Sequence, residues 1–244
     1  MQIAIVLYSG FTALDALGPY EVFKMLPDVE LRFVSHKTGP VATDRGILVV
    51  GATHSFAETP APDIVLVPGS EAHTAVAAAD GELKDWLQQV HATTRLTTSV
   101  CSGAVVLAAA GMLENRPVTS HWAAFDALRR LGAKPRPSER IVRSERVWTA
   151  AGVSAGIDLA FTIAEEVAGH DTAERIQLMI EYDPQPPQNA GHMDKAPPEI
   201  AKAARAEMAY LSRNPSNVIA VSKLLWRQAL DKARKTILRT AKSP

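Results

Sequence analysis

Two patterns of apolar and polar residues follow one another along most of this chain. Some apolar runs are short, as in strands, and others recur every three or four residues, as on the buried face of a helix. The strand-length runs are Ile3–Tyr8, Glu30–Ser35, Ile47–Val50, Asp63–Val67, Arg95–Val100, Arg140–Arg143 and Arg146–Thr149. The helical patterns are Tyr20–Leu26, Gly81–Thr93, Gly103–Leu113, Ala123–Leu131, Gly156–Ala168 and Thr172–Tyr182.

This alternation predicts an α/β fold. Strands buried on both faces and separated by helices form a mostly parallel sheet with helices on both sides. The tight turn between Arg140–Arg143 and Arg146–Thr149 predicts an antiparallel hairpin added to that sheet. We therefore expect a three-layer sandwich of the flavodoxin-like type.

The predicted α/β domain covers residues 1–182. Asp183–Pro187 ends any helix, and the chain looks irregular through Pro198. Residues 183–244 are then expected to form a helical C-terminal extension that packs on the core or on a partner subunit. Its last helix carries an apolar stripe of Val218, Val221, Leu225, Leu230, Ala233 and Ile237.

Charge and composition narrow the class of protein. The 244 residues include 26 Lys and Arg against 26 Asp and Glu, which argues against a nucleic-acid or membrane partner. Ten of these bases and only two acids lie in residues 202–244, where a solvated helix face is the simplest interpretation and a phosphate-binding tail the alternative. One cysteine, no apolar run long enough to cross a bilayer and no signal-peptide pattern favour a cytoplasmic protein.

Most familiar catalytic motifs are missing from the sequence. No phosphate-binding glycine motif, no G-x-S-x-G and no H-E-x-x-H is present, and no two histidines stand four residues apart. With a single cysteine, we expect no zinc site.

Cys101 is the residue that stands out. It lies between the strand Arg95–Val100 and the helix Gly103–Leu113, with no loop residues to soften the turn. A sharp strand-to-helix switch of this kind often holds its apex residue in a strained conformation, at the sheet edge where open α/β folds bind ligands. Helix N-terminal amides would lower the pKa of the thiol and favour the thiolate. The alternative is a buried structural cysteine.

Two other segments could serve such a nucleophile. Gly69 and Ser70 follow the strand Asp63–Val67, and their backbone N–H groups are candidates for an oxyanion hole, unless the segment is a plain turn. Asp15 follows the first strand, where it is either a helix cap or a general acid/base kept partly protonated by apolar surroundings.

These segments resemble the ThiJ/PfpI family of the class I glutamine-amidotransferase-like superfamily, and most closely its isonitrile-hydrating members. The resemblance covers about residues 1–195. It rests on Leu14-Asp15 with Gly18-Pro19, Val67-Pro68-Gly69, Ser99–Gly103, Ser120–Ala123, Gly152–Asp158 and Glu181–Pro187.

The resemblance implies roles for individual residues. Cys101 would be the nucleophile, Asp15 the proton carrier, and Ser102 a hydroxyl where these hydratases carry threonine. Ser70 replaces the second glycine of the family's P-G-G, so its backbone N–H remains but its conformational freedom is reduced. His121 lies where family members often carry a histidine, and it is either a supporting residue or purely structural. These two serines put the precise substrate in doubt.

The implied activity is a cofactor-free and metal-free hydration. The thiolate would attack the terminal carbon of an isonitrile after Asp15 protonates its nitrogen. The resulting thioimidate would add water, activated by the same carboxylate, and release an N-substituted formamide. The alternatives are another cysteine-dependent activity of the family (glyoxalase-like, amidase or deglycase) and a non-catalytic redox or small-molecule sensor.

The expected partners are a small-molecule substrate and a second copy of the chain. The homodimer follows from the resemblance. Family members that regulate transcription carry a DNA-binding region after this domain, and the 62 residues beyond Tyr182 are too few for its two helix-turn-helix motifs. We therefore expect no binding to nucleic acid.

Overall fold

A seven-stranded sheet forms the centre of the molecule. The computed structural model describes residues 1–213 and 215–224. Neighbouring strands follow the order β10-β11-β7-β6-β1-β2-β5, and every pair is parallel except β10 with β11. The strands are β1 Gln2–Val6, β2 Glu30–Ser35, β5 His54–Ser55, β6 Ile64–Val67, β7 Leu96–Ser99, β10 Ile141–Ser144 and β11 Val147–Ala150. The predicted parallel sheet and its antiparallel hairpin are confirmed.

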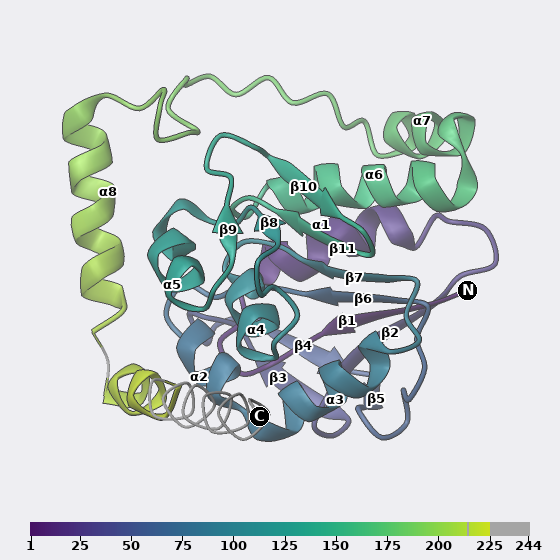
Figure 1. Cartoon of the computed structure of the whole chain (residues 1–244). Helices are drawn as coiled ribbons and strands as arrows, with labels where there is room; N and C mark the ends of the chain where they lie inside the picture. The colour runs from purple at the N-terminus through teal and green to yellow at the C-terminus, as the bar shows by residue number, and fades with distance from the viewer. Residues whose placement is uncertain (214, 225–244) are drawn as a thin grey trace, which may run out of the picture.

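Helices cover both faces of this sheet (Figure 1). One layer contains α1 Ala13–Phe23, α6 Ala155–Ala168 and α7 His170–Met179, and the other contains α2 Thr74–Ala79, α3 Gly81–His91, α4 Gly103–Ala109 and α5 Phe125–Arg130. Central strands are apolar on both sides because both sides are covered; β6, for example, is buried at all four positions. The three-layer α/β fold is therefore confirmed.

Helix α1 begins seven residues before the predicted helix Tyr20–Leu26. It includes the Gly18-Pro19 pair, which normally indicates a break. Much of the helix is buried between the sheet and α6, so its apolar residues form no single stripe. This placement puts Asp15 inside the first helical turn.

The apolar run Ile47–Val50 is not a buried strand of the sheet. It leads into β4 Val49–Ala52, which pairs with β3 Gly39–Ala42 in a separate two-stranded sheet. Ile47 is 90% exposed at the turn of this hairpin. An apolar run alone does not show whether another element covers it, and this one is uncovered in the isolated chain.

The remaining short elements lie around α5. They are β8 Pro117–Val118, the 3₁₀ helix η1 Trp122–Ala124 and β9 Lys134–Pro135, and β8 pairs with β9. No helix among the described residues is long and apolar enough to cross a membrane.

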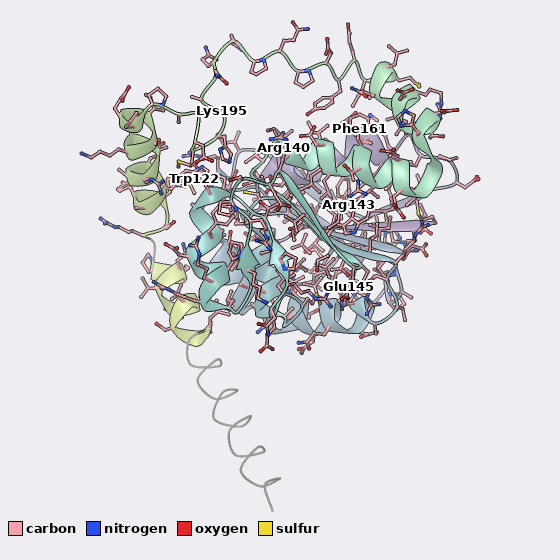
Figure 2. All side chains as sticks on the ribbon, turned by 45° about the horizontal axis from the view of Figure 1, so that its top comes forward. Trp122, Arg140, Arg143, Glu145, Phe161 and Lys195 are labelled. Carbon is pink, nitrogen blue, oxygen red and sulfur yellow. The ribbon has the colours of Figure 1, made fainter. Side chains whose placement is uncertain are left out.

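The chain beyond α7 runs around the edge of the molecule to a further helix, α8 Pro198–Leu211 (Figure 1). As predicted, residues 183–197 form neither helix nor strand. The Arg205 guanidinium lies 5.8 Å from the centre of the Trp122 ring, at the edge of the core beside α8 (Figure 2). A second helical stretch covers 215–224. The division of the chain at residue 182 stays a prediction.

The predicted C-terminal stripe is only partly described. Val218 and Val221 are 64% and 43% exposed in the isolated chain, and Val221 also lines a cavity. Leu225, Leu230, Ala233 and Ile237 lie outside the described residues.

Candidate active site

Cys101 occupies the predicted sharp turn between β7 and α4. Its backbone has a φ of +57°, in the left-handed region that residues with a side chain seldom adopt. Its N–H donates to the Ala151 carbonyl at 3.1 Å, and its own carbonyl accepts a 2.6 Å hydrogen bond from the Ser120 hydroxyl. These bonds hold the strained residue in place, and the predicted elbow geometry is confirmed.

Two glycines allow the elbow to pack this closely. A Cβ on Gly103 would lie 2.2 Å from the Val67 carbonyl oxygen, and one on Gly69 would lie 2.6 Å from the Ser102 nitrogen and 2.9 Å from the Cys101 Cβ. Atoms cannot approach so closely without displacement. Gly69 therefore matters through its missing side chain, which lets the turn after β6 touch the cysteine.

The Cys101 thiol faces backbone donors but is almost fully buried. The N–H groups of Val153 and Ser102 are directed at it and act to lower its pKa. Val153, just before α6, also has a positive φ, of +27°. Valine seldom adopts this conformation, so no local pattern in the sequence assigned a role to Val153.

Asp15 lies against the same sulfur from the other side. It is 0% exposed, and its Oδ2 accepts a 2.8 Å hydrogen bond from the Gly69 N–H. Burial raises the pKa of this carboxyl to about 7, although the Gly69 bond and the contact with the Cys101 thiol both act in the opposite direction. Asp15 is thus placed to hold a proton near neutral pH, as the apolar-surroundings interpretation predicted.

The predicted stable thiolate is not supported by this environment. Burial is the largest effect and raises the pKa of the Cys101 thiol; the nearby Asp15 carboxylate raises it further. The two backbone donors and the Ser102 hydroxyl do not reverse this, because Cys101 is only 5% exposed. The expectation of a lowered pKa was therefore wrong in direction: the resting sulfur carries its proton, and the neighbouring carboxylate is available to accept it.

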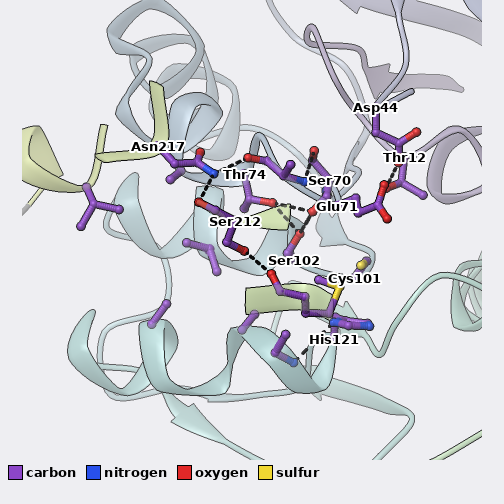
Figure 3. Close-up of a pocket in the computed structure, with 18 of the residues that line it drawn as sticks. Thr12, Asp44, Ser70, Glu71, Thr74, Cys101, Ser102, His121, Ser212 and Asn217 are labelled. Carbon is purple, nitrogen blue, oxygen red and sulfur yellow. Dashed lines mark hydrogen bonds between the residues drawn. The ribbon is translucent and has the colours of Figure 1, made fainter. Parts of the chain in front are cut away.

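Ser102 belongs to a small polar network beside the cysteine (Figure 3). Its hydroxyl accepts a 3.0 Å hydrogen bond from the Ser70 N–H and lies 2.6 Å from the Thr74 hydroxyl. Thr74 in turn donates to the Ser70 carbonyl at 3.0 Å. Nothing in the sequence pattern singled out Thr74.

Gly69 and Ser70 were predicted to offer two free N–H groups to an oxyanion. In the structure each N–H has a partner inside the protein: the Asp15 carboxylate for Gly69 and the Ser102 hydroxyl for Ser70. Each amide carries a single hydrogen, so here these two groups orient the acid and the hydroxyl. The donors that face the sulfur itself are those of Val153 and Ser102.

His121 lies in the cavity next to Cys101 but does not pair with its thiol in the described structure (Figure 3). Its Nδ1 accepts a 3.4 Å hydrogen bond from the Ala123 N–H, and its ring packs on Gly152, where a Cβ would be 2.4 Å from the ring. Burial lowers the pKa of this histidine. A neutral imidazole is therefore part of the cavity wall.

A cavity of about 630 Å³ opens above Cys101. It is lined by side chains from the α/β core and, on one side, from the C-terminal extension (Figure 3). Tyr182 lies elsewhere: its hydroxyl donates to Asp158 at 2.7 Å, and its ring stacks on Phe161. Within residues 1–213 and 215–224, no cluster of three His, Cys, Asp or Glu side chains could hold a metal ion.

Comparison with known proteins gives a consistent answer. The sequence profile of the DJ-1/PfpI family matches residues 1–166. The chain is 39% identical over 209 residues to the isonitrile hydratase of Pseudomonas putida, which covers 86% of this chain and 90% of that protein.

Solved structures show the same fold. A ThiJ/PfpI family protein from Pseudomonas syringae superimposes with a TM-score of 0.83 at 36% identity over 90% of both chains. The DJ-1beta protein of Drosophila melanogaster has a TM-score of 0.67 at 18% identity and covers 75% of this chain and 98% of its own. The second likeness bears on the fold alone.

Proposed function

The chain belongs to the DJ-1/PfpI family, and from that premise we propose that it is a cysteine-dependent isonitrile hydratase. The observation that carries the proposal is the contact between Cys101, which lines the cavity, and the fully buried carboxyl of Asp15. The likeness to the Pseudomonas putida isonitrile hydratase over most of both chains supports the choice of substrate.

The first step is addition of the thiol to the isonitrile. Asp15, as carboxylate, accepts the Cys101 proton while sulfur bonds to the terminal carbon, and the same proton then passes to that carbon. The product is a thioimidate, R–N=CH–S–Cys101. The sequence-based expectation was that Asp15 protonates the substrate nitrogen. In the proposed step the proton ends on the carbon instead, because the thioimidate carries a hydrogen there. Charge that develops on sulfur during attack is stabilised by the Val153 and Ser102 N–H groups.

The second step is hydrolysis of the thioimidate. Asp15 accepts a proton from water as the water oxygen bonds to the same carbon, and it passes this proton to the substrate nitrogen. As the carbonyl forms from the new hydroxyl, the carbon–sulfur bond breaks, the hydroxyl proton passes to sulfur through Asp15, and R–NH–CHO leaves. Water and the isonitrile are the only reactants consumed, and the carboxyl returns to its starting state.

Two of the other activities considered from the sequence, the amidase and the redox sensor, have less support. An amidase of this superfamily would use a Cys–His pair, and His121 makes no hydrogen bond to the thiol in the described structure. A peroxide sensor needs an accessible thiolate, whereas this thiol is buried and its pKa is raised.

The test is a direct assay of product. Wild type is expected to convert p-nitrophenyl isocyanide to the corresponding formamide, and Cys101→Ala to lose that activity. Methylglyoxal is offered in parallel. If wild type turns over only the aldehyde, or if the alanine variant keeps its formamide production, the proposal is wrong.

A further inference from the structure

The cavity above Cys101 is closed on one side by the helical residues 215–224. The face of this helix that meets the core consists of Asn217, Ala220, Val221 and Leu224, at spacings of three, one and three residues. Asn217 and Ala220 are only 8% and 4% exposed and Val221, at the edge of this face, is 43% exposed, whereas Ile219 on the opposite face is 58% exposed. The helix is therefore docked, with a defined inner face.

Asn217 ties this helix to the core and to the end of α8. Its side-chain amide donates to the Ala72 carbonyl and, at 3.1 Å, to the Ser212 carbonyl. Ala72 also lines the cavity, between Ser70 and Thr74 of the polar network beside Cys101. We call the five extension residues that line the cavity the C-terminal wall: Met208, Ser212, Asn217, Val221 and Leu224.

Small apolar side chains face the cavity from η1 and α5. Ala123, Ala124 and Ala127 line it, and Val105 and Leu131 extend the same apolar surface. Short side chains here leave the space unfilled. A volume of about 630 Å³ equals that of about 20 waters at ~30 Å³ each, far more than a methyl or dicarbonyl group occupies. Cavities of this size hold organic molecules with one or more rings.

We propose that the C-terminal wall selects the substrate by the group attached to its nitrogen, and that this group is bulky and apolar. The inference rests on the proposed hydration of isonitriles. The terminal carbon must reach the sulfur at the buried end, so the rest of the molecule lies between the alanines and the wall. Burial of an apolar group there stabilises the complex, whereas a small group leaves apolar surface in contact with water.

The test fills the cavity from the wall. Val221→Trp is compared with Ile219→Trp, a control on the opposite, exposed face of the same helix. Wild type should prefer p-nitrophenyl isocyanide to methyl isocyanide in kcat/KM by about tenfold or more. Val221→Trp should lower kcat/KM for the aryl substrate about tenfold and change the methyl substrate less than about threefold. The control should match wild type.

A second measurement does not depend on isonitrile turnover. Cys101 is the only cysteine, so alkylation by iodoacetamide and by N-phenyl iodoacetamide reports access through the cavity. Val221→Trp should slow the phenyl reagent selectively, and Leu224→Ala, which enlarges the cavity, should speed it. If both isonitriles are inert in wild type but this selectivity is present, the proposed function fails and the role of the wall stands. The inference is overturned if the wall variants leave two ratios unchanged: the ratio of kcat/KM between the two isonitriles, and the ratio of alkylation rate between the two iodoacetamides.

Discussion

Cys101 and Asp15 are in contact and both are buried, and burial disfavours the charged form of each side chain. Burial raises both pKa values, and each negative group would make ionisation of the other harder. In the proposed reaction, attack by sulfur and transfer of its proton to the carboxylate are therefore coupled. Chemistry then requires the state of the pair that holds one proton, which forms as the pH rises past the pKa of Asp15.

This coupling predicts the pH dependence of activity. Burial raises the pKa of Asp15 to about 7, so the carboxylate form that accepts the thiol proton dominates only above that value. The kcat/KM for an isonitrile should rise about tenfold per pH unit below pH ~7 and level off above it. A steady-state profile from pH 5 to 9 tests this. A flat profile, or one that falls through pH 7, contradicts the assignment of Asp15 as the base.

Ser102 gives a second prediction for a single residue. Ser102→Ala removes the hydroxyl that accepts from the Ser70 N–H and contacts Thr74, and so leaves a buried donor without its partner. We expect a loss of about 1–3 kcal/mol in the free energy of unfolding, measured by urea denaturation, with reduced turnover. Ser102→Thr keeps the hydroxyl and should retain most of both. Equal losses in the two variants would mean that the hydroxyl is unimportant.

The sequence was enough to identify Cys101 and Asp15, but not to predict the direction in which the pKa of the thiol shifts. The position of Cys101 between strand and helix, and of Asp15 after the first strand, could be read from the chain. The sign of the thiol pKa shift could not, because it depends on how completely distant segments cover the sulfur. Val153 and Thr74 were missed for a related reason: their roles come from a backbone conformation and from tertiary contacts, which no local pattern signals.

At the turn that carries Cys101, the neighbouring segments pack so closely that a Cβ on Gly69 or Gly103 would clash. The turn after β6 approaches Cys101 through Gly69, and α4 approaches β6 through Gly103. The order of strands places β6 beside both β1 and β7, so the segments that follow these three strands come together at one edge of the sheet. The site is thus a consequence of sheet order as much as of the residues themselves.

Gly69→Ala tests this packing. The added methyl would lie 2.6 Å from a backbone nitrogen, so the turn must move; we expect a loss of about 1–3 kcal/mol in stability and a larger loss of activity. Gly81→Ala is the matched control, because its added methyl meets nothing within 4 Å at the start of α3. That variant should keep full activity and unfold within about 1 kcal/mol of wild type. An equally mild effect at Gly69 would contradict the close approach.

Most of the elements followed from periodicity, and the errors have physical causes. Strands β1 and β6 are apolar runs, β2 alternates apolar and polar residues, and β7 carries β-branched residues; each has a turn or a helix at its ends, which is why they could be predicted. The start of α1 was missed because much of that helix is buried, so it shows no stripe. The run Ile47–Val50 was misinterpreted because exposure depends on what covers a segment, and the sequence does not contain that information.

In the whole molecule, the α/β core supplies the reacting groups and the C-terminal extension closes the cavity over them. The sequence predicted that an extension packs on something, but not that Asn217 and Val221 would lie at the cavity. That arrangement depends on the path of residues 183–197 around the core, which have no regular structure to guide a prediction. It also gives the cavity two linings, one from the α/β core and one from the C-terminal extension.

The buried acid also affects stability of the whole fold. Burial raises the pKa of Asp15 from 3.8 to about 7, so the folded state keeps a proton that the unfolded state has lost over this interval. The contribution of Asp15 to the free energy of unfolding should therefore fall as pH rises from about 4 to 7, by up to about 4 kcal/mol. Asp15→Asn removes the ionisation and should unfold at higher urea than wild type at pH 8, but not at pH 4.

Glu21→Gln on the exposed side of α1 is the control for this comparison, and it should follow wild type at both pH values. An Asp15→Asn variant less stable than wild type at pH 8 would contradict the cost assigned to the buried carboxylate.

The most direct test of the account is the rate at which iodoacetamide alkylates Cys101 as a function of pH, in wild type and in Asp15→Asn. The account holds that Asp15 moves a proton and does not ionise the resting sulfur. Because the carboxylate raises the pKa of the thiol, its removal should shift the onset of alkylation to lower pH. If alkylation in wild type is already maximal at pH 6, or if Asp15→Asn shifts its onset to higher pH, the carboxylate is keeping the sulfur ionised and the account is wrong.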